Sequence, residues 1–120
     1  MIAIIIGTRP EFIKILPLVR EFKKNQIKFK LIHTGQHYSK NLSDIFLREY
    51  KDIKVDYNLK VGSHLQSKQT ALMMEKLEKI LINVNYTHVI VYGDTNTGLS
   101  GALVAAKISH LKTIHIEAGL

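Results

Sequence analysis

Two carboxylates, Asp94 and Glu117, each follow a short apolar run, and their type and placement suit proton transfer. If the two runs are neighbouring parallel strands, both side chains lie on one rim of a sheet. Burial and the repulsion between two negative charges can then raise the pKa of one carboxyl and make it a proton acceptor or donor. Two plainer roles remain open from these residues alone: Asp94 as the N-cap of a following helix, and Glu117 as a solvated side chain.

The segment Gly7-Thr8-Arg9-Pro10-Glu11 stands where an apolar run gives way to a helical pattern. The free N–H groups of a first helical turn, together with Arg9 and Lys14, could face one anion such as a phosphate. The segment is neither a Walker loop nor a G-x-G-x-x-G fingerprint, so it does not favour a P-loop or a dinucleotide site. The alternative is a well-capped helix start with a solvated arginine.

Three histidines lie near one another in the sequence. His33, His37 and His64 lack the spacing of metal ligands, so no metal site is predicted. His37 ends the segment Thr34-Gly35-Gln36-His37, which also follows an apolar run. A solvated or structural histidine is the alternative to a role at a site.

Apolar patterning indicates the elements that position these segments. The runs 2–6 and 88–92 predict buried strands, 29–34 and 112–116 predict further strands, and 53–59 predicts a short one. Helices are predicted after Thr8, at 40–50, at 65–82 and at 96–109. The residues expected to face the core are Ile13, Leu16, Pro17, Val19, Arg20 and Phe22 in the first helix, and Leu72, Met73, Leu77, Ile80 and Leu81 in the third. In the fourth, Gly98, Ser100, Gly101, Ala102, Ala105 and Ala106 permit a close approach to the sheet.

The alternation of strands and helices predicts an α/β fold, a Rossmann-like doubly wound parallel sheet built from βαβ crossovers. In such sheets, ligands bind at the carboxyl ends of the strands. All four polar segments lie at such ends, so the sequence predicts that they share one binding region.

The composition bounds the class of protein. The chain has 120 residues, 46% of them hydrophobic and 22% charged, which suits one domain with a core and excludes wholesale disorder. The absence of cysteine excludes disulfides, thiolate metal sites and cysteine nucleophiles. No apolar run reaches the roughly 18 residues that span a bilayer, and no signal peptide precedes the first strand. A soluble, cytoplasmic chain without a membrane partner is therefore expected.

The charge balance suits an anionic partner. Seventeen Lys and Arg residues stand against ten Asp and Glu, a formal net charge of +7. The lysine-rich stretch 23–30 contains one aromatic residue, Phe29, which opens a predicted strand, and no repeated aromatic interleaving for base stacking, so it indicates a solvated surface and no nucleic-acid partner.

Taken together, the four polar segments resemble those of a known family. Gly7-Thr8-Arg9-Pro10-Glu11, Thr34-Gly35-Gln36-His37, Gly93-Asp94-Thr95 and His115-Ile116-Glu117-Ala118-Gly119-Leu120 occur in the order and spacing of the non-hydrolysing UDP-N-acetylglucosamine 2-epimerases. The resemblance extends over essentially all of this chain, but only over the amino-terminal part of the family's longer chain. One departure is Tyr92, where the family often has a histidine before Gly-Asp-Thr.

The resemblance implies an architecture and a reaction. Residues 1–120 would form an N-terminal Rossmann-like domain, incomplete and without the second domain of a GT-B-type pair, between which the sugar nucleotide binds. The reaction converts UDP-GlcNAc to UDP-ManNAc by elimination of UDP to a 2-acetamidoglucal and re-addition, with no cofactor. Asp94 and Glu117 correspond to catalytic carboxylates, Arg9 and Lys14 to positions that bind the nucleotide diphosphate, and His37 to a residue lining the cleft.

The resemblance also bears on activity and on association of the chain. Because further catalytic positions of the family lie beyond Leu120, the 120 residues alone are expected to be inactive. A 2-epimerase of another UDP-2-acetamido sugar, such as a diacetamido uronic acid nucleotide, and a non-catalytic nucleotide-diphosphate-binding module are the alternatives. If the last strand lies at the margin of the sheet, Ile114 and Ile116 would be exposed there, and we expect self-association, for example as a homodimer.

Overall fold

The computed structural model describes residues 1–35, 48, 50–51 and 53–119. Its elements are β1 (Ile2–Ile6), α1 (Arg9–Lys24), β2 (Phe29–His33), β3 (Tyr57–Asn58), α3 (Gln66–Leu81), β4 (His88–Tyr92), α4 (Asn96–Lys107) and β5 (Lys112–Ile116). The helix predicted at 40–50 falls largely outside the described residues, and so does His37. The strand predicted at 53–59 is present but shorter, since only Tyr57 and Asn58 pair with β2.

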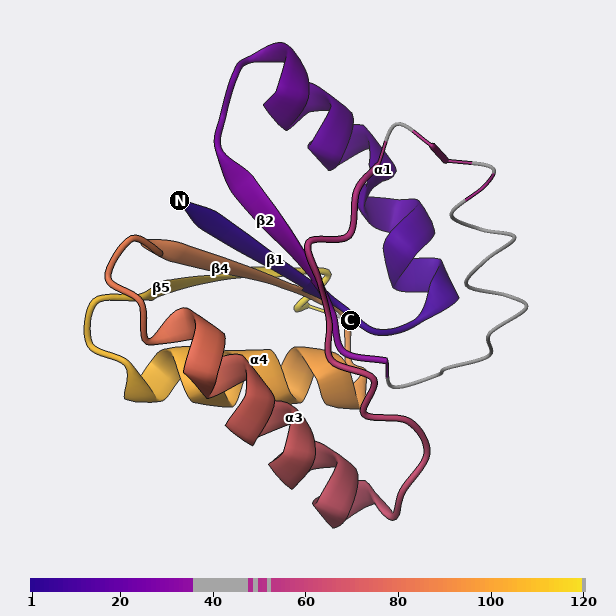
Figure 1. Cartoon of the computed structure of the whole chain (residues 1–120), viewed down its shortest axis with the longest axis vertical. Coiled ribbons are helices and arrows are strands. Elements are labelled where there is room, and N and C mark those ends of the chain that lie inside the picture. Colours follow the sequence, from indigo (N-terminus) through magenta and orange to yellow (C-terminus); the bar gives the residue numbers. More distant parts are fainter. Residues whose placement is uncertain (36–47, 49, 52, 120) are drawn as a thin grey trace.

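The five strands form one parallel sheet in the order β3-β2-β1-β4-β5. The chain moves outward from β1 to one edge, returns, and then continues to the other edge, which is the doubly wound arrangement. Figure 1 shows α1 on one side of the sheet and α3 and α4 on the other. The predicted fold class is therefore confirmed.

The central strand β1 is buried on both faces, as its unbroken apolar run predicts. Its side chains alternate between two cores. Ala3 and Ile5 belong to the core beneath α3 and α4, whereas Ile4 and Ile6 belong to the core beneath α1. This double burial fixes where β1 ends, and hence where the turn that opens α1 lies.

Helix α1 begins with a capping box. The Thr8 side chain accepts from the Glu11 N–H, and the Glu11 side chain accepts from the Thr8 N–H. The apolar stripe predicted for this helix is wrong in part, because Phe12 and Ile15 are buried while Ile13, Pro17 and Arg20 are exposed. The buried apolar residues of α1 are Phe12, Ile15, Leu16 and Val19, whose spacing of three and four residues places them on one helical face.

Helices α3 and α4 cover the opposite face. In α3, Met73, Leu77 and Leu81 are fully buried, as predicted, while Leu72 and Ile80 are partly buried. In α4, a Cβ on Gly101 would lie only 2.8 Å from Val91 Cγ1, so the absent side chain allows the expected close approach to the sheet. None of the described helices combines the length and the apolarity needed to cross a bilayer.

Candidate active site

A pocket of about 370 Å³ opens at the carboxyl ends of β1, β4 and β5. Its lining residues are Thr8, Pro10, Glu11, Lys14, Tyr92, Gly93, Asp94, Thr95 and Glu117. Asp94 and Glu117 both line this pocket because the β4–β5 register pairs Tyr92 with Ile116. The two carboxylates therefore follow the paired last residues of neighbouring strands. The structure thus brings together three of the predicted site residues: Asp94, Glu117 and Lys14.

Asp94 does not cap α4. The N-cap is Thr95, whose Oγ1 accepts a hydrogen bond of 3.3 Å from the Gly98 N–H. The interpretation of Asp94 as an N-cap is therefore wrong. Asp94 is exposed and its carboxylate makes no hydrogen bond or ion pair with the residues that the structure describes. Its charge is left available to the pocket.

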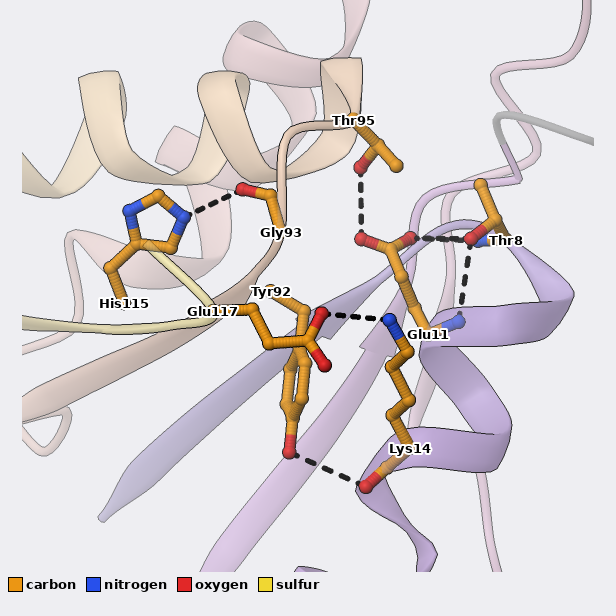
Figure 2. Close-up of polar contacts among 8 residues, drawn as sticks. All are labelled: Thr8, Glu11, Lys14, Tyr92, Gly93, Thr95, His115 and Glu117. Atoms are coloured by element: carbon orange, nitrogen blue, oxygen red, sulfur yellow. Dashed lines mark hydrogen bonds and ion pairs between the residues drawn. The ribbon is translucent and has the colours of Figure 1, made fainter. Parts of the chain in front are cut away.

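Glu117 is held by a cation across the pocket. Its Oε2 lies 2.7 Å from Lys14 Nζ, an ion pair between the end of β5 and the first half of α1 (Figure 2). Glu117 therefore does more than face water. It also has a φ of +62°, in the left-handed region that residues other than glycine rarely adopt. Strained backbone of this kind concentrates at functional sites.

The charge of Glu117 affects the pKa values of Lys14 and Tyr92. Hydrogen bonding to Glu117 raises the pKa of Lys14, desolvation opposes this, and the charges of Glu117, Glu11 and Asp94 raise it further. Burial, with the charge of Glu117, raises the pKa of Tyr92, whose hydroxyl donates to the Lys14 carbonyl at 3.4 Å. At neutral pH, Lys14 is therefore a cation and Tyr92 a neutral donor.

Replacing Glu117 with glutamine is expected to lower the pKa of Lys14, because the amide keeps the shape but not the charge. Since the folded-state pKa of Lys14 is raised above 10.5, the pair stabilises the fold below that pH and ceases to do so as the pH rises through the folded-state value. An NMR titration of Lys14 Cε in both chains measures the shift. The exposed Glu75→Gln change is the control, and an unchanged Lys14 pKa in the Glu117 variant would contradict the ion pair.

The turn between β1 and α1 differs from the predicted phosphate cradle. The N–H groups of Gly7 and Thr8 both donate to Glu11 Oε1, at 3.0 and 2.9 Å, and the Glu11 N–H faces Thr8 Oγ1 at 3.5 Å. These three N–H groups are already satisfied, so they are not free for an anion. The Arg9 N–H makes no hydrogen bond with the described residues, which leaves this donor and the cationic side chains for an anion. Arg9 is exposed at the first position of α1 and lies outside the residues that line the pocket.

Three further residues of this region were named from the sequence without a role at the site. Glu11 is a buried carboxylate, Tyr92 lies beside the Lys14–Glu117 pair, and His115 Nε2 lies 2.6 Å from the Gly93 carbonyl (Figure 2). The pattern Thr8-x-x-Glu11 is a capping-box signature and could have revealed the first. No group of three or more metal-binding side chains occurs within the described parts of the chain.

The sequence profile of the UDP-N-acetylglucosamine 2-epimerase family matches residues 20–120. The chain belongs to this family. The UDP-N-acetylglucosamine 2-epimerase of Methanococcus maripaludis is 50% identical over 119 residues, which cover 99% of this chain and 32% of that protein. The crystal structure of the Methanocaldococcus jannaschii UDP-GlcNAc 2-epimerase, in complex with UDP-GlcNAc and UDP, superimposes with a TM-score of 0.91 at 45% identity.

The alignments with members of this family cover nearly the whole of this chain but only part of each relative. The alignment with the M. jannaschii structure covers 99% of this chain and 33% of that one, so the chain spans about a third of the length of these relatives. A UDP-2,3-diacetamido-2,3-dideoxy-D-glucuronate 2-epimerase of Pseudomonas aeruginosa is also similar, at 39% identity. These relatives are thus named for two different UDP-sugars.

Proposed function

We propose that these residues form one wall of the active site of a UDP-N-acetylglucosamine 2-epimerase. The observation that carries the proposal is the pocket in which Asp94, Glu117 and Lys14 meet at the carboxyl edge of a parallel sheet. In the reaction, the C2 proton passes to a carboxylate and the C1–O bond to UDP breaks, which leaves 2-acetamidoglucal and UDP. Re-addition of UDP, with a proton delivered to the other face of C2, gives UDP-ManNAc.

The described side chains divide this work. Asp94 has no side-chain partner within the described residues and is free to take or return a proton. Glu117 is the second catalytic carboxylate, and its hydrogen bond raises the pKa of Lys14 and holds the ammonium group at the pocket. Lys14, with Arg9 from the same helix, is proposed to bind the diphosphate and stabilise its departure. His37 is proposed to line the cleft.

The wider architecture is part of the proposal. Residues 1–120 are proposed to be the N-terminal Rossmann-like domain of a GT-B-type pair, with the sugar nucleotide bound between the two domains. The residues that line the pocket all lie at the carboxyl edge of this one sheet, which supports the proposal that they form one side of such a cleft. We therefore expect the 120 residues to bind UDP weakly and to give no turnover alone.

Calorimetric titration of the chain with UDP tests the binding half of the proposal. Lys14→Ala is expected to weaken the affinity about tenfold or more, because it removes a charge-assisted contact to phosphate. Lys68→Ala, at an exposed position of α3, is the control and should leave the affinity unchanged. Equal affinity in the parent chain and the Lys14 variant would contradict the assigned role.

Turnover requires a longer protein. In a chimaera, residues 1–120 replace the corresponding third of the M. maripaludis relative, and the product formed from UDP-GlcNAc is identified by chromatography. We expect UDP-ManNAc. Activity only with the diacetamido uronic acid nucleotide would favour the alternative sugar, and an inactive, folded chimaera would contradict the proposed function.

The open edge of the sheet supports a proposal about association. Among the described strands, β5 has a neighbour on one side only, and Ile114 on it is 42% exposed. We expect self-association through this edge, and Ile114→Lys should reduce it, since a lysine blunts an edge strand. Light scattering at high concentration measures this. Val84→Lys, which changes an exposed loop residue, is the control, and a monodisperse monomeric parent chain would contradict the proposal.

A further inference from the structure

Asp94 is placed by its neighbours in the chain. It lies in the turn between β4 and α4, and its own carboxylate contacts none of the described side chains through a hydrogen bond or ion pair. What fixes its position must therefore act on the residues on either side, Gly93 and Thr95. Both of them are tied to other elements of the sheet edge (Figure 2).

On one side, the turn is tied to β5. The Gly93 N–H donates to the Ile116 carbonyl at 2.9 Å, and His115 Nε2 meets the Gly93 carbonyl at 2.6 Å. Gly93 has a φ of +60°, which glycine adopts without strain and which permits this arrangement. These contacts fix the turn relative to the strand that carries Glu117.

On the other side, the turn is tied to α1 by a buried carboxylate. Glu11 is only 4% exposed, and its Oε2 accepts a 2.8 Å hydrogen bond from Thr95 Oγ1. The two oxygens of Glu11 do different work. Oε1 receives the N–H groups of Gly7 and Thr8 and the Thr8 hydroxyl, which completes the capping of α1.

The second oxygen is not needed for capping. Oε2 is directed at Thr95, 84 positions away in the sequence. A buried carboxylate oxygen needs a hydrogen-bond donor, because an unpaired one carries a desolvation penalty. Any nearby donor would serve that purpose for Oε2, and here the donor is Thr95, the residue next to Asp94. The same hydroxyl accepts from the Gly98 N–H, so the link also reaches the first turn of α4.

We propose that Glu11 is a positioning residue, which acts through Thr95 to hold Asp94 at a fixed place relative to the helix that carries Lys14. Glu11 itself does not touch the reacting atoms. The consequence for turnover rests on the proposed epimerase function, in which Asp94 must meet the sugar while Lys14 meets the diphosphate. A misplacement of about 1 Å between such groups can cost two orders of magnitude in rate.

NMR relaxation of the 120-residue chain tests the link without any need for activity. The parent chain should give a backbone order parameter near 0.85 at Asp94, and Thr95→Val, which keeps the shape and removes the hydroxyl, should lower it toward about 0.6. Thr95→Ser should restore the parent value, and Glu75→Gln, a change in an exposed glutamate of α3, should have no effect. An unchanged order parameter in Thr95→Val would overturn the proposal.

The double variant separates the link from the capping of α1. If Glu11 acts on Asp94 through Thr95, adding Glu11→Gln to Thr95→Val should loosen Asp94 no further, although it weakens the cap of α1. A further fall at Asp94 in the double variant would show that Glu11 acts by another route and would overturn the proposal.

Kinetics in the chimaera then test the consequence. Thr95→Val should lower kcat about tenfold with KM within about twofold, and Thr95→Ser should restore kcat. An unchanged kcat in a Thr95→Val chain whose Asp94 is loosened would overturn the positioning role. A chimaera that is inactive with its natural residues would instead contradict the proposed function, and the relaxation data would still decide whether the link exists.

Discussion

Replacing Gly7 with alanine is expected to lower the free energy of unfolding by about 3 kcal/mol, the upper part of the usual range for overpacking a core. A Cβ at this position would lie 2.0 Å from Thr97 Oγ1 and 2.5 Å from Thr34 Oγ1. Both threonines are fully buried, and their hydroxyls bond to each other at 2.8 Å. Because threonine is stiff at χ1, neither can turn aside without losing contacts.

Urea unfolding followed by circular dichroism measures the loss. Gly119→Ala is the matched control, because a Cβ there would meet nothing within 4 Å. Adding Thr97→Ala to Gly7→Ala should recover part of the lost stability, since the nearest clashing atom is then gone. A Gly7→Ala chain within about 0.5 kcal/mol of the parent would show that the turn is free to move, contrary to the packing described.

The effect of Gly7 reaches the site as well as the core. Its N–H donates to Glu11, so a displaced Gly7 would disturb the carboxylate that links α1 to the β4–α4 turn. We therefore expect stability and the order of Asp94 to fall together in Gly7→Ala. This connects the tight packing beneath β1 to the geometry of the pocket.

The strands and their parallel pairing could be predicted because each strand is a short local signal. Runs such as Ile2–Ile6 and residues 89–92 are hydrophobic and are followed by glycine, and strands separated by helices can pair in parallel with little ambiguity. The gathering of Asp94 and Glu117 followed from the same reasoning, since parallel strands bring their carboxyl ends to one edge.

Other features depended on contacts that no local pattern contains. Asp94 and Thr95 are both good cap residue types, so the local sequence could not choose between them. The structure has Thr95 as the N-cap, and Thr95 also donates to Glu11 across the sheet edge. The start of α1 after Thr8 was predicted, but its buried face depends on how the helix is rotated against the sheet. The predicted stripe lay one residue too far along the chain, so Ile13 is at the surface. The ion pair between Glu117 and Lys14 joins residues 103 positions apart in the sequence, so no local pattern indicates it.

Replacing Asp94 with asparagine or Glu117 with glutamine is expected to lower kcat of the chimaera by about 10²–10⁴-fold, the usual contribution of a positioned acid or base. Both changes keep the size of the side chain and remove its proton affinity. Asp94 makes no hydrogen bond or ion pair with the described side chains, so Asp94→Asn should leave the stability of the 120-residue chain unchanged, which separates chemistry from folding.

The two carboxylates should differ in what else they change. Glu117→Gln releases Lys14, so it should alter the affinity for UDP as well as kcat, whereas Asp94→Asn should affect kcat with little change in UDP affinity. Glu75→Gln in the chimaera is the control for a lost surface carboxylate. If Asp94→Asn kept more than about a tenth of the parent kcat, Asp94 would not be the group that moves the C2 proton. The base would then have to be Glu117 or a residue contributed from outside these 120.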